Sequence, residues 1–106
     1  MDLYQLQTEV SEWAARNFPS AMPHQPLLGA AEEIGELSHA HLKMEQGIRT
    51  NEDHMLGKVD AIGDVVIFLA HYCHLNGLNL GSCIYNTWEK VKQRDWTTKK
   101  SDGVTA

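Results

Sequence analysis

The chain has 106 residues, of which 42% are hydrophobic and 22% are charged, a balance typical of one small soluble domain. Its formal net charge of −5 argues against a general binding surface for nucleic acid polymers. Two cysteines without C-x-x-C spacing do not make a disulfide framework, and the first residues lack the features of a signal peptide. The longest apolar run, VVIFLA, is too short to span a bilayer. We therefore expect a cytoplasmic protein that does not bind membranes.

Apolar residues recur at steps of three and four along most of the chain, which is the pattern of amphipathic helices. The expected helices run over about Leu3–Asn17, Leu27–Gln46, Glu52–Asn76 and Gly81–Trp96. Three prolines separate the first two helices, and glycines follow the second and third. The pattern predicts an all-α fold, a four-helix bundle that forms one domain over residues 1–96. Residues 97–106 are expected to be a polar, frayed tail.

The second helix carries three acids in the sequence EEIGE: Glu32, Glu33 and Glu36. Its apolar side is expected to centre on Ala30, Ile34, Leu37 and His41, with His41 as a packed core histidine. Glu33 then lies at one shoulder of the apolar side, and Glu36 lies further round, beside Glu32 and Lys43. These acids can reach a groove between helices. The alternative is a solvated acidic face.

The third helix is apolar nearly all round, which predicts that it is buried, yet Asp60, Asp64 and His71 follow one stripe of it. Buried carboxylates are costly unless they are paired or bound to a metal. Ion pairs with Lys58, Lys43 or Arg49 are possible, but the acids outnumber these bases. Two carboxylate groups on successive helices therefore predict a cation site, and oxygen ligands favour Mg²⁺ or Mn²⁺ over zinc.

The fourth helix has Asn86, Lys90 and Arg94 at steps of four on one side. Lysine and arginine on one stripe can bind phosphate oxygens, and arginine can do so with two parallel hydrogen bonds. A solvated basic edge is the alternative. Beside an acidic metal site, such a stripe predicts a bound metal–phosphate complex. Lys43 is a further candidate to bind the substrate, and His71 is a candidate to line the ligand pocket.

The sequence EEIGE, followed after 23 residues by DAIGDVVIFLA, resembles the MazG-like nucleoside triphosphate pyrophosphohydrolases. Members of that family carry EE-x-x-E and then E-x-x-D on two helices of an all-α bundle, and the resemblance covers about Leu27 to Trp96. It implies Mg²⁺-dependent hydrolysis of a nucleoside triphosphate, expected to be a deoxynucleotide, to the monophosphate and pyrophosphate. It also implies a homo-oligomer, a dimer or a dimer of dimers, with the site near a subunit boundary.

The resemblance carries residue roles onto this chain. The implied metal ligands are Glu33, Glu36 and Asp64. Glu32 matches the first acid of the motif, where it would orient water, accept its proton or assist the metal. Where the family has Glu, this chain has Ala61, and we expect Asp60, one position earlier, to replace the missing ligand. The implied phosphate-contacting residues are Asn86, Lys90 and Arg94.

Two functions from other classes stay open. Glu36 and His39 form the Glu-x-x-His of ferritin-like carboxylate bundles, but the third and fourth helices have no second copy of it. A catalytically silent helical oligomer that acts as a binding module is the other alternative, and Ala61 is its best support. A pyrophosphate-release assay with Mg²⁺ and deoxynucleotides separates all three.

Assembly follows from the third helix, whose apolar residues spread around most of its circumference. Four short helices cannot cover every face of such a helix, and contiguous exposed apolar patches mark interfaces. We therefore expect oligomerisation to complete the bundle, and Trp88 and Trp96 are candidates for the contact. Trp13 is likewise expected in the core or at an interface.

Overall fold

The structure is a computed structural model that describes residues 1–105, and over these residues the chain is all-helical, as predicted. The helices are α1 (Leu3–Asn17), α2 (His24–Gln46), α3 (His54–Leu75) and α4 (Leu80–Val91). No strand occurs in this described part of the chain. The all-α prediction and the prediction of four helices are therefore confirmed.

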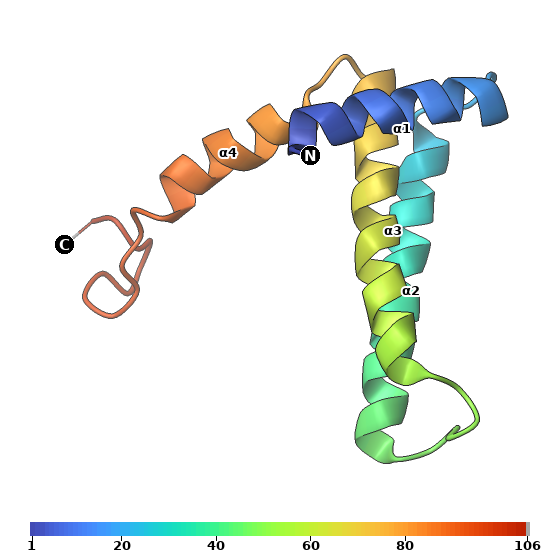
Figure 1. Ribbon diagram of the computed structural model, residues 1–106. Helices are drawn as coiled ribbons and strands as arrows, with labels where there is room; N and C mark the ends of the chain where they lie inside the picture. The colour runs from blue at the N-terminus through green and yellow to red at the C-terminus, as the bar shows by residue number, and fades with distance from the viewer. Residues whose placement is uncertain (106) are drawn as a thin grey trace.

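The four helices make an open, angular shape (Figure 1). Helices α2 and α3 lie side by side as an antiparallel hairpin, and α1 crosses the end of the hairpin opposite its turn. Helix α4 leaves the end of α3 at a bend of 106° and projects as an arm. The molecule extends over 50 × 42 × 26 Å. One chain thus leaves the bundle open, and its completion by oligomerisation stays a prediction.

The starts of α2 and α3 differ from the predicted ones by two or three residues. Helix α2 begins at His24, three residues before the expected start, with Pro26 in its first turn. Proline is tolerated there because the first N–H groups of a helix have no helical acceptor. Helix α3 begins at His54 instead of Glu52, since the Asp53 side chain accepts a hydrogen bond from the N–H of Leu56 at 3.0 Å.

Helix α4 ends at Val91, five residues before the expected end at Trp96, so Arg94 lies outside the helix. Asp95 offers the backbone an alternative to the helix, because its carboxylate accepts hydrogen bonds from Thr97 and Thr98.

Residues 97–105, the expected polar tail, are mostly exposed and form turns. The tail folds back, and the Asp95 N–H donates to the carbonyl oxygen of Gly103 at 2.7 Å. Gly103, buried in this loop, has φ of 80°, a left-handed conformation that glycine adopts without strain.

The core lies where α1 crosses α3 and α4 begins. Its buried residues are Val10, Ala70, Cys73 and Leu80, with Leu3, Leu6, Val66 and Leu69 packed against them. Gln7 fixes this junction from inside: its side chain donates to the Leu78 carbonyl at 2.9 Å and accepts from the Leu80 N–H at 2.6 Å. These contacts hold α1 against the turn from which the α4 arm starts.

None of the described helices is by itself long and apolar enough to cross a membrane. Taken together as a bent pair, α3 and α4 are, by length and composition only.

Candidate functional site

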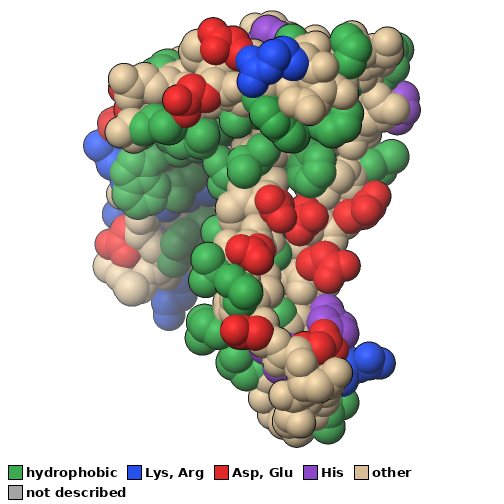
Figure 2. Space-filling view, turned by 45° about the vertical axis from the view of Figure 1, so that its right-hand side comes forward, with side chains coloured by type: hydrophobic (Ala, Val, Ile, Leu, Met, Phe, Trp, Pro, Cys, Tyr) green, Lys and Arg blue, Asp and Glu red, His purple; other side chains and the backbone are tan. Residues whose placement is uncertain are grey.

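The acids of α2 and α3 come together on one side of the hairpin. Glu33 is half-buried on α2 and Asp64 is half-buried on α3. Burial raises the pKa of Glu33, and the charges of Asp64, Glu36 and Glu32 raise it further, in that order. Figure 2 shows acidic side chains gathered over the middle of the hairpin. The structure thus brings four of the five predicted acids near one another.

Bases do not neutralise this group. Among residues 1–105, the carboxylates of Glu32, Glu33, Glu36 and Asp64 make no ion pair and no hydrogen bond. Two of the proposed partners bind elsewhere: Lys43 donates to the Gln46 side chain at 3.2 Å, and Lys58 donates to the Met44 sulfur at 3.4 Å. The ion-pair alternative therefore fails for these two bases, and the mutual repulsion of the acids is uncompensated within the described chain.

The donor chemistry of the group fits a hard divalent cation, because all of its ligand atoms are carboxylate oxygens. The described residues contain no set of three His, Cys, Asp or Glu side chains arranged to hold an ion in these rotamers. A cation would therefore require the flexible glutamate side chains to turn inward. In this conformation the acids are near neighbours and not a preformed cage.

Asp60 and Ala61, the position where this chain departs from the family's motif, lie in different surroundings. Ala61 is 2% exposed and packs in the hairpin interior, whereas Asp60 is exposed to solvent. Asp60 is also not among the charges that raise the pKa of Glu33. Asp60 differs in direction from Ala61 by about 100°, but it precedes Asp64 by one helical turn, and its role as the replacement ligand stays a prediction.

A pocket of about 880 Å³ adjoins the acid group and shares Asp64 with it. Its aromatic walls are Trp13, Phe18 and Phe68, and its other lining residues include Glu9, Gln25 and His71. His71 is 8% exposed, and burial lowers its pKa, with a smaller contribution from the charge of His74. His71 is therefore neutral at pH 7, where its ring nitrogens can donate one hydrogen bond and accept another.

Sequence reasoning missed the contribution of α1 to this pocket. The FPSAMPHQP segment was read only as a helix breaker, yet Phe18, Ser20 and Ala21 line the pocket. Trp13, which was expected in the core or at an interface, is 45% exposed at the pocket wall. A break rich in proline between two amphipathic helices was the available signal, since such loops frequently carry binding residues.

The predicted phosphate-binding residues lie on the arm. Asn86 and Lys90 are exposed on α4, and Arg94 follows in the turn after the helix. Because α4 projects away from the hairpin, these side chains and the acid group occupy different parts of one chain (Figure 1). Within a single copy, the structure therefore does not bring the bases to the acids.

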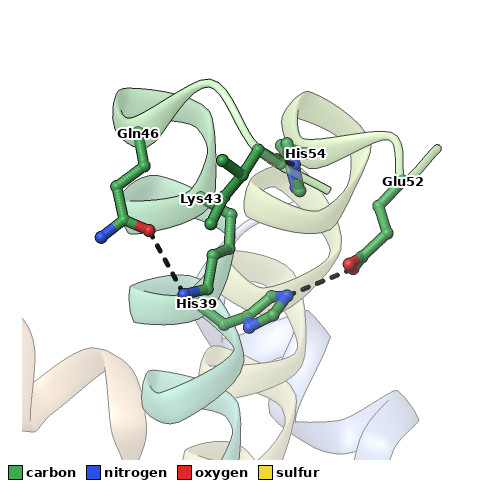
Figure 3. Close-up of polar contacts among 6 residues, drawn as sticks. His39, Lys43, Gln46, Glu52 and His54 are labelled. Carbon is green, nitrogen blue, oxygen red and sulfur yellow. Dashed lines mark hydrogen bonds and ion pairs between the residues drawn. The ribbon is translucent and has the colours of Figure 1, made fainter. Parts of the chain in front are cut away.

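The tip of the hairpin holds a separate polar cluster (Figure 3). His39 Nε2 lies 3.2 Å from Glu52 Oε2, and His54 Nε2 lies 3.1 Å from the carbonyl oxygen of Ile48. These contacts fasten the loop between α2 and α3. The imidazole of His39 thus makes its polar contact with the loop.

Two further expectations for α2 change. Lys43 lies at the tip, seven residues past Glu36, which is about 10 Å along a helix axis. The prediction that His41 lies in the core is wrong. His41 is exposed, and its Nε2 lies 3.3 Å from Glu45 Oε2. The buried residues of α2 are Pro26, Ala30 and Ala40, because the helix turns this side towards α3.

Comparison with protein-family models, curated proteins and solved structures found no significant match to this chain. The resemblance to the MazG-like enzymes therefore rests on the motif residues and on the helices that carry them.

Proposed function

We propose that the protein is a Mg²⁺-dependent nucleoside triphosphate pyrophosphohydrolase that cleaves a (deoxy)nucleoside triphosphate to the monophosphate and pyrophosphate. One observation carries the proposal: four carboxylates without basic partners adjoin a largely apolar pocket, and Asp64 belongs to both. Metal-bound phosphates and a planar base are the two parts of one nucleotide. The arrangement supports a ligand that needs both environments next to each other.

A solvated acidic face accounts less well for the acid group. Carboxylates on a solvated helix surface usually have basic side chains nearby and keep their usual pKa. Here burial and three neighbouring charges raise the pKa of Glu33, so the charged form is held at a cost in free energy. A bound divalent cation removes this cost, which is the physical reason to place the metal at Glu33, Glu36 and Asp64.

Each part of the chain has a task in the proposed reaction. When bound, Mg²⁺ would neutralise charge on the phosphates and make a bound water more acidic. Glu32, exposed beside this group, is the proposed acceptor of the water's proton. The pocket would receive the base and sugar, with aromatic side chains against the base and neutral His71 as a hydrogen-bonding group. Its apolar walls would also exclude bulk water from that part of the site.

The proposal includes a homo-oligomer in the cytoplasm, a dimer or a dimer of dimers. Support comes from the many large hydrophobic side chains that a single copy leaves exposed, which include Val59, Ile62 and Trp88. Asn86, Lys90 and Arg94 are proposed to contact the phosphates from a neighbouring copy, because the arm projects away from the hairpin of its own chain.

The test is pyrophosphate release from a panel of deoxynucleoside triphosphates with Mg²⁺. Glu33→Gln should lower turnover by at least about 10–100-fold, the loss that follows even when only a residue supporting a metal ligand is replaced. Glu45→Gln is the matched control, because Glu45 lies on the same helix but pairs with His41. Calorimetric titration of Mg²⁺ into each variant adds a readout without nucleotide. An active Glu33→Gln variant with normal Mg²⁺ affinity would contradict the proposal.

A further inference from the structure

The two cysteines of the chain lie on either side of the turn that joins α3 to α4 (Figure 1). Cys73 is in the last turn of α3, which ends at Leu75, and Cys83 is in the first turn of α4, which begins at Leu80. Both are free thiols, but Cys73 is buried and Cys83 is exposed. Neither belongs to the acid group or to the pocket, so the proposed reaction does not use them.

The packing of the turn brings the two thiols together. Leu80, the first residue of α4, lies in the same buried cluster as Cys73. The Leu78 N–H donates to the Cys73 carbonyl oxygen at 2.8 Å, and the Cys83 N–H donates to the Asn79 carbonyl oxygen at 2.9 Å. The same short segment is thus bonded to the end of α3 and to the start of α4. Across it, the side chains of Cys73 and Cys83 are hydrogen-bonded to each other.

Two residues of α1 hold this arrangement in place. The Gln7 side chain donates to the Leu78 carbonyl at 2.9 Å and accepts from the Leu80 N–H at 2.6 Å. The Tyr4 ring lies over the first turn of α4, where a Cβ at Gly81 would come within 3.0 Å of it. The two sulfur atoms are therefore neighbours before any reaction. A disulfide requires such closeness, and groups held in contact react far faster than groups that must first meet.

The two cysteines differ in their access to reagents. Cys83 is exposed, so an oxidant dissolved in water can reach its sulfur. Cys73 is 6% exposed, and burial raises the pKa of its thiol, with smaller contributions from the charge of Cys83 and from the hydrogen bond with Cys83. Because the thiolate is the reactive form, the buried and protonated Cys73 is protected from direct oxidation at pH 7. An oxidant should therefore react first at Cys83.

We infer that Cys73 and Cys83 are a redox-active pair, which a peroxide oxidises to an intramolecular disulfide across the turn between α3 and α4. The Cys83 thiolate attacks one peroxide oxygen, the O–O bond breaks, and Cys83 becomes a sulfenic acid while the other oxygen leaves as water. The Cys73 sulfur then bonds to the Cys83 sulfur, the S–O bond breaks, and the hydroxyl leaves as water with the proton of the Cys73 thiol. Two thiols thus give two electrons and two protons to hydrogen peroxide, which is reduced to two waters. The inference does not depend on the proposed function.

The disulfide would fix the direction of the α4 arm. It closes the loop of residues 73–83 and links the first turn of the arm to α3 by a covalent bond, which restricts the chain more than the hydrogen bonds of Gln7 do. The exposed Cys83 sulfur also lets a reducing thiol attack the disulfide and restore the pair. Such a reversible bond is typical of a redox sensor in a reducing compartment.

The first experiment uses the wild-type protein. Fully reduced protein is treated with a small molar excess of hydrogen peroxide, quenched with catalase and alkylated with iodoacetamide in denaturant. The chain should carry no alkyl group, have lost two hydrogen atoms by intact mass, and run as a single chain on a non-reducing denaturing gel. Because no lysine or arginine lies between the cysteines, chymotrypsin is the protease that should give two joined peptides, which dithiothreitol separates. Two free thiols, a sulfinic acid at Cys83 beside a free Cys73, or disulfides only between chains would overturn the inference.

Serine variants separate the roles of the two thiols. Cys73→Ser should accumulate a sulfenic acid at Cys83 that dimedone traps, because no second thiol lies beside it. In Cys83→Ser, Cys73 should stay unoxidised under the conditions that form the wild-type disulfide. Circular dichroism shows whether each variant is folded. Oxidation of Cys73 at the wild-type rate in a folded Cys83→Ser variant would overturn the assignment of Cys83 as the first site.

The third experiment tests the effect on the arm. Oxidised wild type should have a Tm higher by about 8 °C or more than reduced wild type, the size expected for a typical disulfide in a domain of this length. Its amides in the first turn of α4 should also exchange hydrogen more slowly. Cys83→Ser treated with peroxide is the matched control, because it keeps all four methionines and so reports the effect of their oxidation. Equal Tm and equal exchange in oxidised and reduced wild type would overturn the claim that the disulfide fixes the arm.

Discussion

Gly29→Ala is the substitution whose effect follows most directly from the contacts between α2 and α3. A Cβ at Gly29 would lie 2.5 Å from Cε1 of the Phe68 ring and within 2.8 Å of two more of its atoms. These distances are far below van der Waals contact, so the ring has to move. Phe68 is also a wall of the pocket, and its displacement therefore changes the pocket's shape as well as the stability of the hairpin.

The magnitude comes from two opposed effects. Alanine in place of glycine within a helix stabilises by about 0.8–1 kcal/mol, whereas overpacking costs about 1–3 kcal/mol. Gly35→Ala is the reference variant, because a Cβ at Gly35 meets nothing within 4 Å. It has the gain in helix propensity without overpacking, so the difference between the two variants measures the cost of overpacking at Gly29. Gly29→Ala should therefore be less stable than Gly35→Ala by about 1–3 kcal/mol, and each 1 kcal/mol shifts Tm by about 4–8 °C in a domain of this size.

The assay is urea unfolding followed by circular dichroism at 222 nm, with all proteins at one concentration because assembly adds to stability. The double variant Gly29→Ala/Phe68→Leu should regain much of the loss, since the smaller side chain can make room for the methyl group. Equal stability of Gly29→Ala and Gly35→Ala would refute the reasoning. It would mean that the Phe68 ring rotates aside without cost.

Three further outcomes test the titrating groups and a helix cap. The folded pKa of Glu33 is raised, so its ionised carboxylate lowers the stability of the folded protein. This destabilisation is absent below the ordinary glutamate pKa and grows as pH rises through the folded value. Glu33→Gln should thus raise Tm of the metal-free protein at pH 7 and lose this advantage near pH 4. The pKa of His71 is lowered, so its contribution to stability is present above its ordinary pKa of about 6.5 and is lost as pH falls through the lowered folded value. His71→Gln should therefore flatten the stability profile below about pH 6.5. Asp53→Ala removes the carboxylate that accepts a hydrogen bond from the Leu56 N–H and caps α3. It should lower the free energy of unfolding by about 0.5–2 kcal/mol in the same urea assay.

The sequence predicted a helix end well where the apolar spacing and a helix-breaking residue stop at the same position. It predicted a helix end less well where local polar contacts determine that end. Helix α1 has the predicted bounds, because its apolar spacing is regular and Asp2 and Gln5 form a capping box. The end of α4 was wrong, since apolar spacing continues to Trp96 while the contacts of Asp95 with the tail stop the helix earlier. Contacts between residues several positions apart in a loop leave no periodic signal.

The candidate site was predictable as a set of acids but not in its neighbours. The spacing of Glu33, Glu36 and Asp64 on two successive helices was enough to expect that they meet across the hairpin. The error at His41 has a physical cause: a helical wheel gives relative directions only, and the side turned towards α3 is set by small residues such as Ala30 and Ala40. Small side chains let two helices approach closely, so the interface follows them and leaves the larger Ile34 exposed.

The direction of the arm links the openness of the single chain to the proposed site. Had α4 folded back over the exposed Ile62 of its own chain, it would cover the side of α3 opposite Asp64, because two residues are about 200° of helical rotation. Gln7 opposes that arrangement, because its amide holds both ends of the turn, at the Leu78 carbonyl and the Leu80 N–H, and is itself buried under α1. Breaking these contacts inside the core would leave polar groups unsatisfied, which costs about 1–3 kcal/mol for each group. A buried side chain of α1 therefore fixes the turn from which the arm starts and so its outward direction.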